Sequence, residues 1–367
     1  MISVPRLPSG LDTPCLVIDL DVVEANARRM QDAVAARGIA LRPHTKTHKS
    51  VELARLQVDA GARGITVGTL GEAEVMAAAG FDDIFIAYPL WAAGPKAARL
   101  RDLATYPGLS LSVGFDSAAG ARQLSDAMRL MRRPLRVVLE VDPGNGRTGV
   151  PPAEAGRVAS AAAELGLEVI GLFTHGGHAY AAPGTAEAAG ADEAAALADG
   201  AALLRSAGLE PTVLSAGSTP SALSAARAPV TELRPGTYLL GDRIEVALGG
   251  SPPDGVAIAV AATVVSASLA GQVVIDAGAK TLTKDLPPYL VGYGALPAYP
   301  DAVIERVSDY HGVVRVPDGT PAPTLGEVVA VIPNHACPVV DLHDDFVATR
   351  SGTVVGRWPV DARGRNG

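Results

Sequence analysis

The segment GIALRPHTKTHK, residues 38–49, joins a short apolar run to a strongly basic octapeptide. If the run is a β-strand that continues to Lys46, its side chains alternate between two faces, and Arg42, His44 and Lys46 share one of them. In a parallel sheet that is covered on both sides, three inward-facing cations are costly unless an anion meets them. The segment therefore predicts a strand that ends at an anionic ligand. A strand that stops at Leu41 and continues as a solvated basic loop stays open.

The same pattern of apolar run, polar junction and helix-like segment recurs up to about residue 240. Apolar residues at helical spacing precede the first run, with Asp21 as the expected N-cap and Gly38 just past the helix end. Strands that alternate with helices indicate parallel pairing, and eight such units match a closed (β/α)8 barrel. The eight expected strands are 40–46, 64–70, 83–90, 109–115, 136–142, 169–175, 212–218 and 232–238.

The composition changes after Gly241, where Val, Pro and Gly become frequent and helical periodicity fades. We therefore predict an α/β protein with a TIM-type barrel over residues 21–241 and a smaller, mainly β C-terminal domain over residues 242–367. Residues 1–20 are expected to pack with the β domain. The uncharged run 255–275 has about the length of a membrane span but lacks flanking Lys or Arg. Because it breaks at Ala270-Gly271, it predicts two buried strands joined by a tight turn.

Length, composition and net charge limit the class of protein. The 367 residues are 48% hydrophobic and 19% charged with a net charge of -8, which allows a large core and argues against nucleic-acid binding. The two cysteines, Cys15 and Cys337, lie far apart, as is typical of a reducing compartment. The first ten residues do not resemble a signal peptide. We therefore expect a cytoplasmic protein that binds neither nucleic acid nor membrane.

Polar residues follow the expected seventh and eighth strands, where barrels commonly hold phosphate. The seventh leads into AGSTP, residues 216–220, and the eighth into RPGTY, residues 234–238. Hydroxyls beside glycine amides suit a phosphate, although ordinary turns use the same residues. A phosphate site together with Lys46 at the end of the first strand indicates an aldehyde cofactor held as an imine. Pyridoxal phosphate (PLP) fits this description.

The hexapeptide GNGRTG, residues 144–149, is a literal GxGxxG motif. A dinucleotide site requires a helix to begin within the motif, whereas Pro151 and Pro152 delay any helix here. The motif is therefore interpreted as a loop that presents Arg147 at the mouth of the barrel.

Six motifs make the sequence similar to the alanine-racemase-like, fold type III PLP enzymes, and within them to the D-serine dehydratase and D-threonine aldolase branch. They span nearly the whole chain: RPHTKTHK (42–49), THGGHAY (174–180), AGSTP (216–220), RPGTY (234–238), DAGAK (276–280) and PNHACP (333–338). The resemblance implies that Lys46 binds PLP covalently and that the site lies near the interface of a homodimer. Lys49 falls on the opposite phase of the expected strand, which independently favours Lys46.

The tripeptide His335-Ala336-Cys337 is the second chemical feature. On a strand, residues two apart face the same way, so the imidazole and the thiolate can share a metal ion. Taken alone, the pair also fits a core histidine and a small buried cysteine. The resemblance implies a divalent metal at these two positions. A thiolate ligand favours zinc, with magnesium or manganese as alternatives.

The expected activity is that of a PLP- and metal-dependent lyase acting on a D-3-hydroxy amino acid, similar to D-serine dehydratase, which forms a keto acid and ammonia. Lys46 is the expected base, with His44 and His311 as further catalytic candidates. The alternatives are a D-threonine aldolase, which forms glycine and an aldehyde, an amino-acid racemase and a non-catalytic PLP carrier. The expected cofactor-binding residues are Lys46, Arg147, His175, Tyr180, Ser218, Thr219, Gly236, Thr237 and Tyr238.

Overall fold

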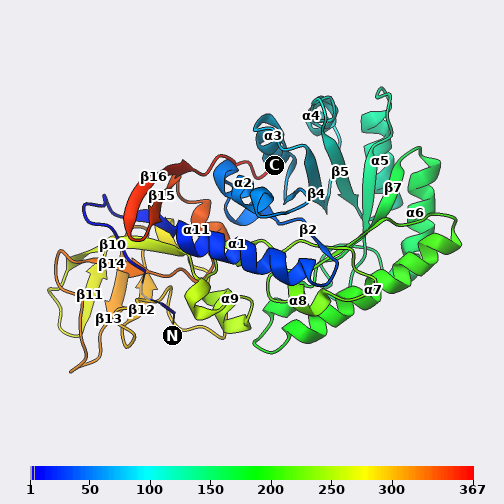
Figure 1. The fold of residues 1–367 in the computed structure, drawn as a ribbon. Helices are drawn as coiled ribbons and strands as arrows, with labels where there is room; N and C mark the ends of the chain where they lie inside the picture. Colours follow the sequence, from blue (N-terminus) through cyan, green and yellow to red (C-terminus); the bar gives the residue numbers. More distant parts are fainter. Residues whose placement is uncertain (1, 4) are drawn as a thin grey trace. The chain divides into compact units, whose positions relative to one another are not determined.

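The computed structural model describes residues 2–3 and 5–367, which divide into two compact units (Figure 1). We call one the barrel unit, formed by Met30–Lys46, Ala54–Gly236 and Gly364–Gly367. The other, the β unit, contains the N-terminal residues up to Arg29 together with Thr47–Leu53 and Thr237–Arg363. Among the described residues, no helix is both long enough and apolar enough to cross a membrane.

Eight parallel strands form the sheet of the barrel unit. Their order is β2-β9-β8-β7-β6-β5-β4-β3, and a parallel bridge between His44 and Thr66 joins the two ends of this order, so the barrel closes. The predicted fold class is therefore confirmed. The strands are β2 (Ala40–Leu41), β3 (Ile65–Val67), β4 (Asp83–Pro89), β5 (Ser110–Phe115), β6 (Arg136–Glu140), β7 (Glu168–Phe173), β8 (Val213–Ala216) and β9 (Glu232–Leu233).

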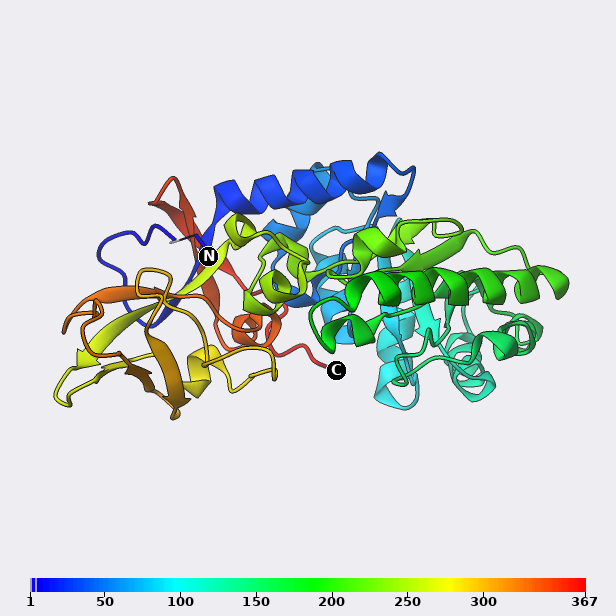
Figure 2. The same cartoon turned by 90° about the horizontal axis from the view of Figure 1, so that it is seen from below.

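Helices connect these strands and lie outside them, with the long green helix α7 prominent in both views (Figures 1 and 2). Side-chain caps set two of the starts: the hydroxyl of Thr69 accepts the N–H of Glu72, and that of Ser117 accepts the N–H of Gly120. Helix α1 (Leu20–Ala35) precedes the first of these strands, and the helices after it are α2 (Val51–Asp59), α3 (Leu70–Ala78), α4 (Pro95–Ala104), α5 (Ala118–Met128), α6 (Ala155–Glu164), α7 (Ala186–Ser206) and α8 (Ala222–Ala225).

The β unit is built on a second sheet, in the order β12-β13-β11-β10-β1-β15-β16, with β14 also paired to β10. Three short helices, α9 (Arg243–Leu248), α10 (Ala279–Leu282) and α11 (Ala336–Val340), belong to the same unit. The strands are β1 (Cys15–Asp19), β10 (Ile258–Ser266), β11 (Gln272–Ile275), β12 (Val303–Val307), β13 (Gly312–Arg315), β14 (Val328–Val331), β15 (Asp345–Arg350) and β16 (Thr353–Pro359).

The long uncharged run forms the two strands that its sequence predicts. Strands β10 and β11 pair antiparallel, and the turn between them contains Gly271 at a φ of 72°. Glycine suits this position because residues with a side chain rarely adopt a positive φ. The run is therefore part of a sheet.

Two local predictions were wrong. The first barrel strand ends at Leu41 and not at Lys46, because the chain turns into a 3₁₀ helix, η1 (Thr45–Thr47). The cap of α1 is Asp19 and not Asp21, since the carboxylate of Asp19 accepts the N–H groups of Asp21 and Val22 at 3.0 and 3.4 Å. Asp21 instead accepts hydrogen bonds from the hairpin between β15 and β16.

Candidate functional site

The two lysines of the basic segment have different surroundings. Lys46 is exposed, its N–H donates to Nδ1 of His44 at 3.3 Å, and none of the ion pairs among the described residues includes its ammonium group. Lys49 is buried, and its Nζ lies 2.8 Å from Oδ1 of Asp341. A buried ammonium held by a carboxylate is not free to react. Lys46 is therefore the better candidate for a covalent bond to a cofactor.

Positive charge gathers around His175, which follows β7 in the barrel unit. Burial lowers the pKa of His175 well below its usual value, and the nearby cations Lys46, Arg147 and Arg234 lower it further. The imidazole is therefore neutral at physiological pH. A region that is rich in cations and has a neutral histidine fits an anionic ligand better than a cationic one.

The loop after β8 presents two buried hydroxyl residues, Ser218 and Thr219. Its conformation depends on Glu193, a fully buried carboxylate on α7. One oxygen of Glu193 accepts the N–H of Gly217 at 2.9 Å, and the other accepts the hydroxyl of Ser221 at 2.8 Å. Gly217 itself has a φ of 89°, which favours glycine. The sequence analysis missed Glu193, because nothing local in the alanine-rich helix indicates its distant partners.

Arg234, the first residue of RPGTY, anchors the loop after β9. Its guanidinium lies near the rings of Phe85 and Phe173, with centroids at 5.7 and 5.3 Å, and donates to the Ser215 hydroxyl at 2.6 Å and the Thr174 carbonyl at 2.5 Å. All of these contacts of Arg234 are with residues of the barrel unit. The residues that follow it, Gly236, Thr237 and Tyr238, are all buried; Gly236 belongs to the barrel unit and the other two to the β unit.

Arg147 and Tyr180 occupy two further loops of the barrel unit. Arg147 is exposed, with Nη2 3.9 Å from Oε1 of the buried Glu140, whose pKa is raised by burial. Tyr180 is half-buried in the 3₁₀ helix η3 (Gly177–Tyr180). In the GxGxxG loop, the N–H groups of Gly144 and Gly146 both bind Oδ1 of Asp142 at 3.1 Å. These amides are occupied by a carboxylate of the protein, and no α-helix begins within the motif.

His335 and Cys337 lie side by side in the β unit, although not on a strand as predicted. The strand β14 ends at Val331, His335 occupies the N-cap position of α11, and Cys337 lies in its first turn. A hydrogen bond joins the imidazole to the thiol. The helix start thus brings the two side chains together in place of strand alternation.

Asp285 fixes the orientation of His335. Its Oδ2 lies 2.6 Å from Nδ1 of the imidazole, which leaves Nε2 as the nitrogen available to Cys337 or to a metal ion. Burial acts to lower the pKa of His335, but its hydrogen bonds to Asp285 and Cys337 outweigh burial and raise the pKa to about 11. In the metal-free chain the imidazole is therefore protonated. A metal ion would take the place of this proton.

Further contacts hold the sulfur and the helix start. Oγ1 of Thr47 lies 3.2 Å and Oγ1 of Thr237 lies 3.7 Å from Sγ of Cys337, so two hydroxyls can donate to a thiolate. The buried carboxylate of Asp242 accepts the N–H of Ala336 at 2.8 Å. The described residues contain no cluster of three or more His, Cys, Asp or Glu side chains that could hold a metal. A metal here would keep open positions for substrate oxygens.

The two histidines that were predicted as further catalytic groups belong to different units. His44 belongs to the barrel unit and accepts the N–H of Lys46. His311 lies in the exposed turn between β12 and β13 of the β unit. Among the described residues, no hydrogen bond connects it to His335 or Cys337. Both catalytic roles stay predictions.

Comparison with known proteins gives the same two-part organisation. Residues 18–244 match "Alanine racemase, N-terminal domain", and residues 257–349 match "Putative serine dehydratase domain". The chain belongs to the alanine-racemase-like family, in the branch that carries a serine dehydratase domain. It is 37% identical to a D-threonine aldolase from Arthrobacter sp, over 96% of this chain and 93% of that protein. It is 35% identical to a D-threo-3-hydroxyaspartate dehydratase from Delftia sp., over 95% of this chain and 97% of that protein.

Solved structures of family members have the same fold. A D-threonine aldolase from Filomicrobium marinum aligns with a TM-score of 0.87 at 32% identity, covering 99% of this chain and 98% of that one. The D-threo-3-hydroxyaspartate dehydratase from Delftia sp. HT23 aligns with a TM-score of 0.86 at 32% identity, covering 95% of this chain and 97% of that one. The resemblance predicted from six motifs is thereby confirmed.

Proposed function

We propose that this family member is a PLP-dependent lyase that acts on D-3-hydroxy amino acids by removing water. The resulting enamine takes up water and hydrolyses to a keto acid and ammonia. The names of its relatives support the lyase class, because they are aldolases and dehydratases of D-threonine or D-3-hydroxyaspartate. The single observation that carries the choice of dehydratase is the His335 and Cys337 pair at the start of α11. A histidine and a thiolate together favour a strongly Lewis-acidic zinc ion.

The barrel unit supplies residues that fit PLP. Lys46 is exposed, and its amine forms no ion pair among the described residues. Ser218 and Thr219 are buried in the loop after β8, where barrels commonly bind phosphate. The cations around His175 suit the negative charge of the cofactor. We assign the ring contacts to His175 and Tyr180. Gly236, Thr237, Tyr238 and Arg147 complete the proposed cofactor-binding set.

Two related structures support the metal assignment. Both are variants of D-threo-3-hydroxyaspartate dehydratase, one with a histidine and the other with a cysteine changed to alanine, and the cysteine variant is described as the metal-free form. The two changed residues are two positions apart, the same spacing as between His335 and Cys337. We assign His335 and Cys337 as ligands of a divalent metal, with zinc ahead of magnesium and manganese.

In the proposed mechanism, residues of the chain move the protons and position the metal ligand. When bound, PLP stabilises negative charge at the substrate Cα and the metal polarises the β-hydroxyl. Lys46 removes the α-proton as the general base, since Lys49 is held by Asp341. Asp285 keeps Nδ1 of His335 occupied, so that Nε2 is the nitrogen left for the metal. His44 and His311 are the remaining candidates for moving the hydroxyl proton.

Product analysis tests the proposed reaction. Purified protein is incubated with D-threo-3-hydroxyaspartate, D-serine and D-threonine, with and without a chelator. We expect a keto acid and ammonia in equal amounts from at least one substrate, and loss of both when the metal is removed. Keto acid formation that a chelator leaves unchanged would contradict the metal assignment.

Aldol cleavage is the second candidate, favoured by the 37% identity to a D-threonine aldolase. In that reaction a base removes the hydroxyl proton and the Cα–Cβ bond breaks, so the products are glycine and an aldehyde. Glycine from D-threonine without ammonia would establish this activity in place of dehydration. Conversion of D-alanine to L-alanine would instead indicate a racemase.

Covalent labelling tests the role of Lys46 independently of activity. Borohydride reduction of the PLP-loaded protein, followed by peptide mapping, is expected to place the label on Lys46. A Lys46→Ala variant should lose the label, and a Lys49→Gln variant, as the matched control, should keep it. A label that stays in Lys46→Ala would overturn the assignment.

We also propose a cytoplasmic homodimer. The family resemblance suggests the dimer, and two cysteines that form no disulfide fit a reducing compartment. Light scattering of the PLP-loaded protein is expected to give twice the mass of one chain. A fully active monomer would disprove the dimer.

A further inference from the structure

A small cavity of about 110 Å³ lies inside the barrel unit at the end where the strands begin. Asp83, Ser110, Arg136 and Glu232, each the first residue of its strand, contribute to its wall. Lys46, by contrast, follows the C-terminal end of β2. Catalysis in barrels takes place at the C-terminal ends of the strands, so this cavity is distinct from the proposed active site.

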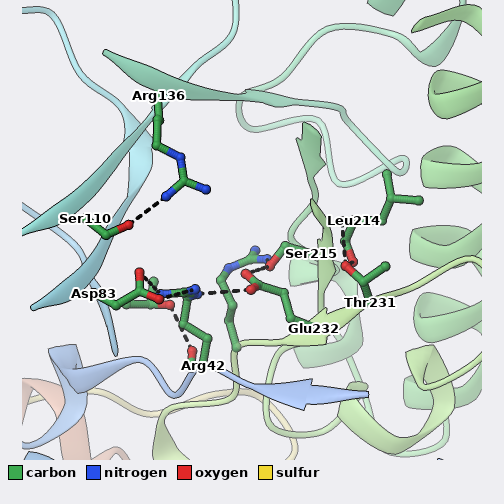
Figure 3. Close-up of polar contacts among 10 residues, drawn as sticks. Arg42, Asp83, Ser110, Arg136, Leu214, Ser215, Thr231 and Glu232 are labelled. Carbon is green, nitrogen blue, oxygen red and sulfur yellow. Dashed lines mark hydrogen bonds and ion pairs between the residues drawn. The ribbon is translucent and has the colours of Figure 1, made fainter. Parts of the chain in front are cut away.

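The charges that line the cavity do not cancel. Its charged side chains are three arginines and two carboxylates: Arg42, Arg63, Arg136, Asp83 and Glu232. The buried Arg42 binds both carboxylates, with Nη1 2.7 Å and Nη2 3.0 Å from the Asp83 oxygens and Nε 3.0 Å from Glu232 Oε2 (Figure 3). Counting all five side chains, the lining carries one excess positive charge.

Two of the lining arginines, Arg63 and Arg136, form no ion pair among the described residues, and Arg136 is the less exposed of the two. Its Nη1 donates to the Ser110 hydroxyl at 2.6 Å, and no ion pair among the described residues includes its guanidinium. Figure 3 shows the guanidinium reaching from the start of β6 toward the pair of Arg42 and Asp83, with its other terminal nitrogen unbound. A half-buried guanidinium has five N–H donors, and one serine hydroxyl satisfies only one of them.

Ser112 provides an independent second donor. Only 7% of this residue is exposed, it lines the cavity, and its hydroxyl makes no hydrogen bond with the described part of the chain. Its hydroxyl is therefore available to donate to a molecule that enters the cavity. Arg136 and Ser112 thus present donors to one enclosed space.

We propose that this cavity binds a small oxyanion, a carboxylate or a phosphate, through Arg136 and Ser112. Guanidinium groups pair with such anions by two parallel hydrogen bonds, a geometry that chloride lacks. A water molecule takes up about 30 Å³ in the liquid, so the space suits a group of a few heavy atoms. Ser110 and Arg136 also line an outer groove of about 660 Å³, which gives the anion a route from solvent.

Thermal unfolding of the PLP-loaded protein tests the proposal, because the cofactor occupies the phosphate site at the barrel mouth. Sodium phosphate and sodium acetate are titrated separately at constant ionic strength against sodium chloride. We expect a saturable rise in the unfolding midpoint with at least one oxyanion and none with chloride. Comparing the two titrations shows whether a phosphate or a carboxylate is preferred.

Variants of Arg136 and Ser112 test whether the rise in the unfolding midpoint comes from this cavity. Arg136→Met is expected to weaken the apparent affinity about tenfold or more, Ser112→Ala severalfold, and Arg136→Lys less than Arg136→Met. Arg133→Met is the matched control, because exposed Arg133 lines only the outer groove. Each variant is first shown to be folded by its circular dichroism and its PLP absorbance.

Two outcomes would overturn the proposal. One is the absence of a saturable response to either oxyanion in the folded wild-type protein, which would mean that water alone fills the cavity. The other is a response that folded Arg136→Met retains in full. Neither outcome bears on the lyase activity, because the experiment measures no turnover.

Discussion

Arg42 and Lys46 belong to one basic segment, yet their side chains serve different purposes. Arg42 is buried and bound by Asp83 and Glu232, whereas Lys46 is exposed. Removing one partner from a buried ion pair typically costs about 3–5 kcal/mol, because the other charge is then left buried alone. The anion that the sequence predicts for Arg42 is thus supplied by the protein itself. For Lys46, a cofactor remains the proposed partner.

Gly64 is required by the close packing around Arg42. A Cβ at this position would lie 2.6 Å from the Asp83 carbonyl and 2.7 Å from Nη1 of Arg42. We expect Gly64→Ala to destabilise the protein by about 1–3 kcal/mol, as overpacking usually does. Chemical denaturation measures this change. Gly356→Ala is the control, because its Cβ would meet only ordinary contacts at 3.7 Å; equal losses in the two variants would contradict the packing argument.

Asp285 is expected to control metal affinity through His335. Carboxylates that hold a metal-binding histidine in place typically contribute about 10–100-fold to metal affinity, so Asp285→Asn should weaken zinc binding by about that factor. Competition with a chromogenic chelator measures it without any enzyme assay. Asp309→Asn, an exposed carboxylate next to Lys280, serves as the control. An unchanged zinc affinity in Asp285→Asn would show that the 2.6 Å contact does not orient the ligand.

At the scale of elements, short helices position the chemistry of the β unit. Helix α11 has five residues, too few to be stable alone, so its start depends on Asp242. The same carboxylate accepts the N–H of Glu245 in α9 at 2.8 Å. One buried aspartate thus caps two helices and fixes the turn that holds His335 and Cys337.

The link between α1 and the β15–β16 hairpin is expected to depend on pH. The backbone N–H of Ser351 holds the pKa of Asp21 below its ordinary value of 3.8, and the Ser351 hydroxyl and Arg350 add to this effect. As the pH falls, the unfolded chain therefore takes up a proton at Asp21 before the folded chain does. The stabilisation is complete above the unfolded pKa and is lost as the pH falls through the folded pKa.

Urea unfolding of wild type and Asp21→Ala at pH 7 and pH 3 measures this dependence. We expect the variant to be less stable at pH 7 and the difference to shrink at pH 3. Asp32→Ala, an exposed aspartate of the same helix without an ion pair among the described residues, is the control. A difference that stays constant with pH would rule out the ionised carboxylate as its source.

At the scale of the whole molecule, the proposed site residues belong to two different units. Lys46 is the last residue of one segment of the barrel unit, and Thr47, which contacts Cys337, begins a segment of the β unit. The proposed cofactor lysine and a hydroxyl of the proposed metal site are therefore neighbours in the sequence.

Metal binding is expected to stabilise the whole chain. A ligand present at a hundredfold excess over its Kd adds about 2.7 kcal/mol to the free energy of unfolding. Zinc added to chelator-treated protein should therefore raise the unfolding midpoint in wild type and not in Cys337→Ala. Cys15→Ala, which changes the other cysteine, should keep the response. A zinc response that survives in Cys337→Ala would place the metal elsewhere.

The sequence by itself determined the order of the elements and the chemistry of the key residues. Runs of apolar residues and their helical or alternating spacing are local properties, so they predicted all eight barrel strands and the paired strands β10 and β11. Lys46 was predicted from its place after the first strand and from the family resemblance, which also implied a metal at His335 and Cys337; both roles stay predictions. The local geometry predicted for these residues was wrong, because a 3₁₀ helix and a helix start replaced the expected strands.

Only the tertiary structure decided which groups meet. Arg42 finds Asp83 and Glu232 at separations of 41 and 190 residues, and Asp285 lies 50 residues before His335. Burying a charge demands a partner, but no local pattern states where in the chain that partner lies. Chain closure into a barrel brings such residues together, and this long-range step is what spacing along the sequence does not encode.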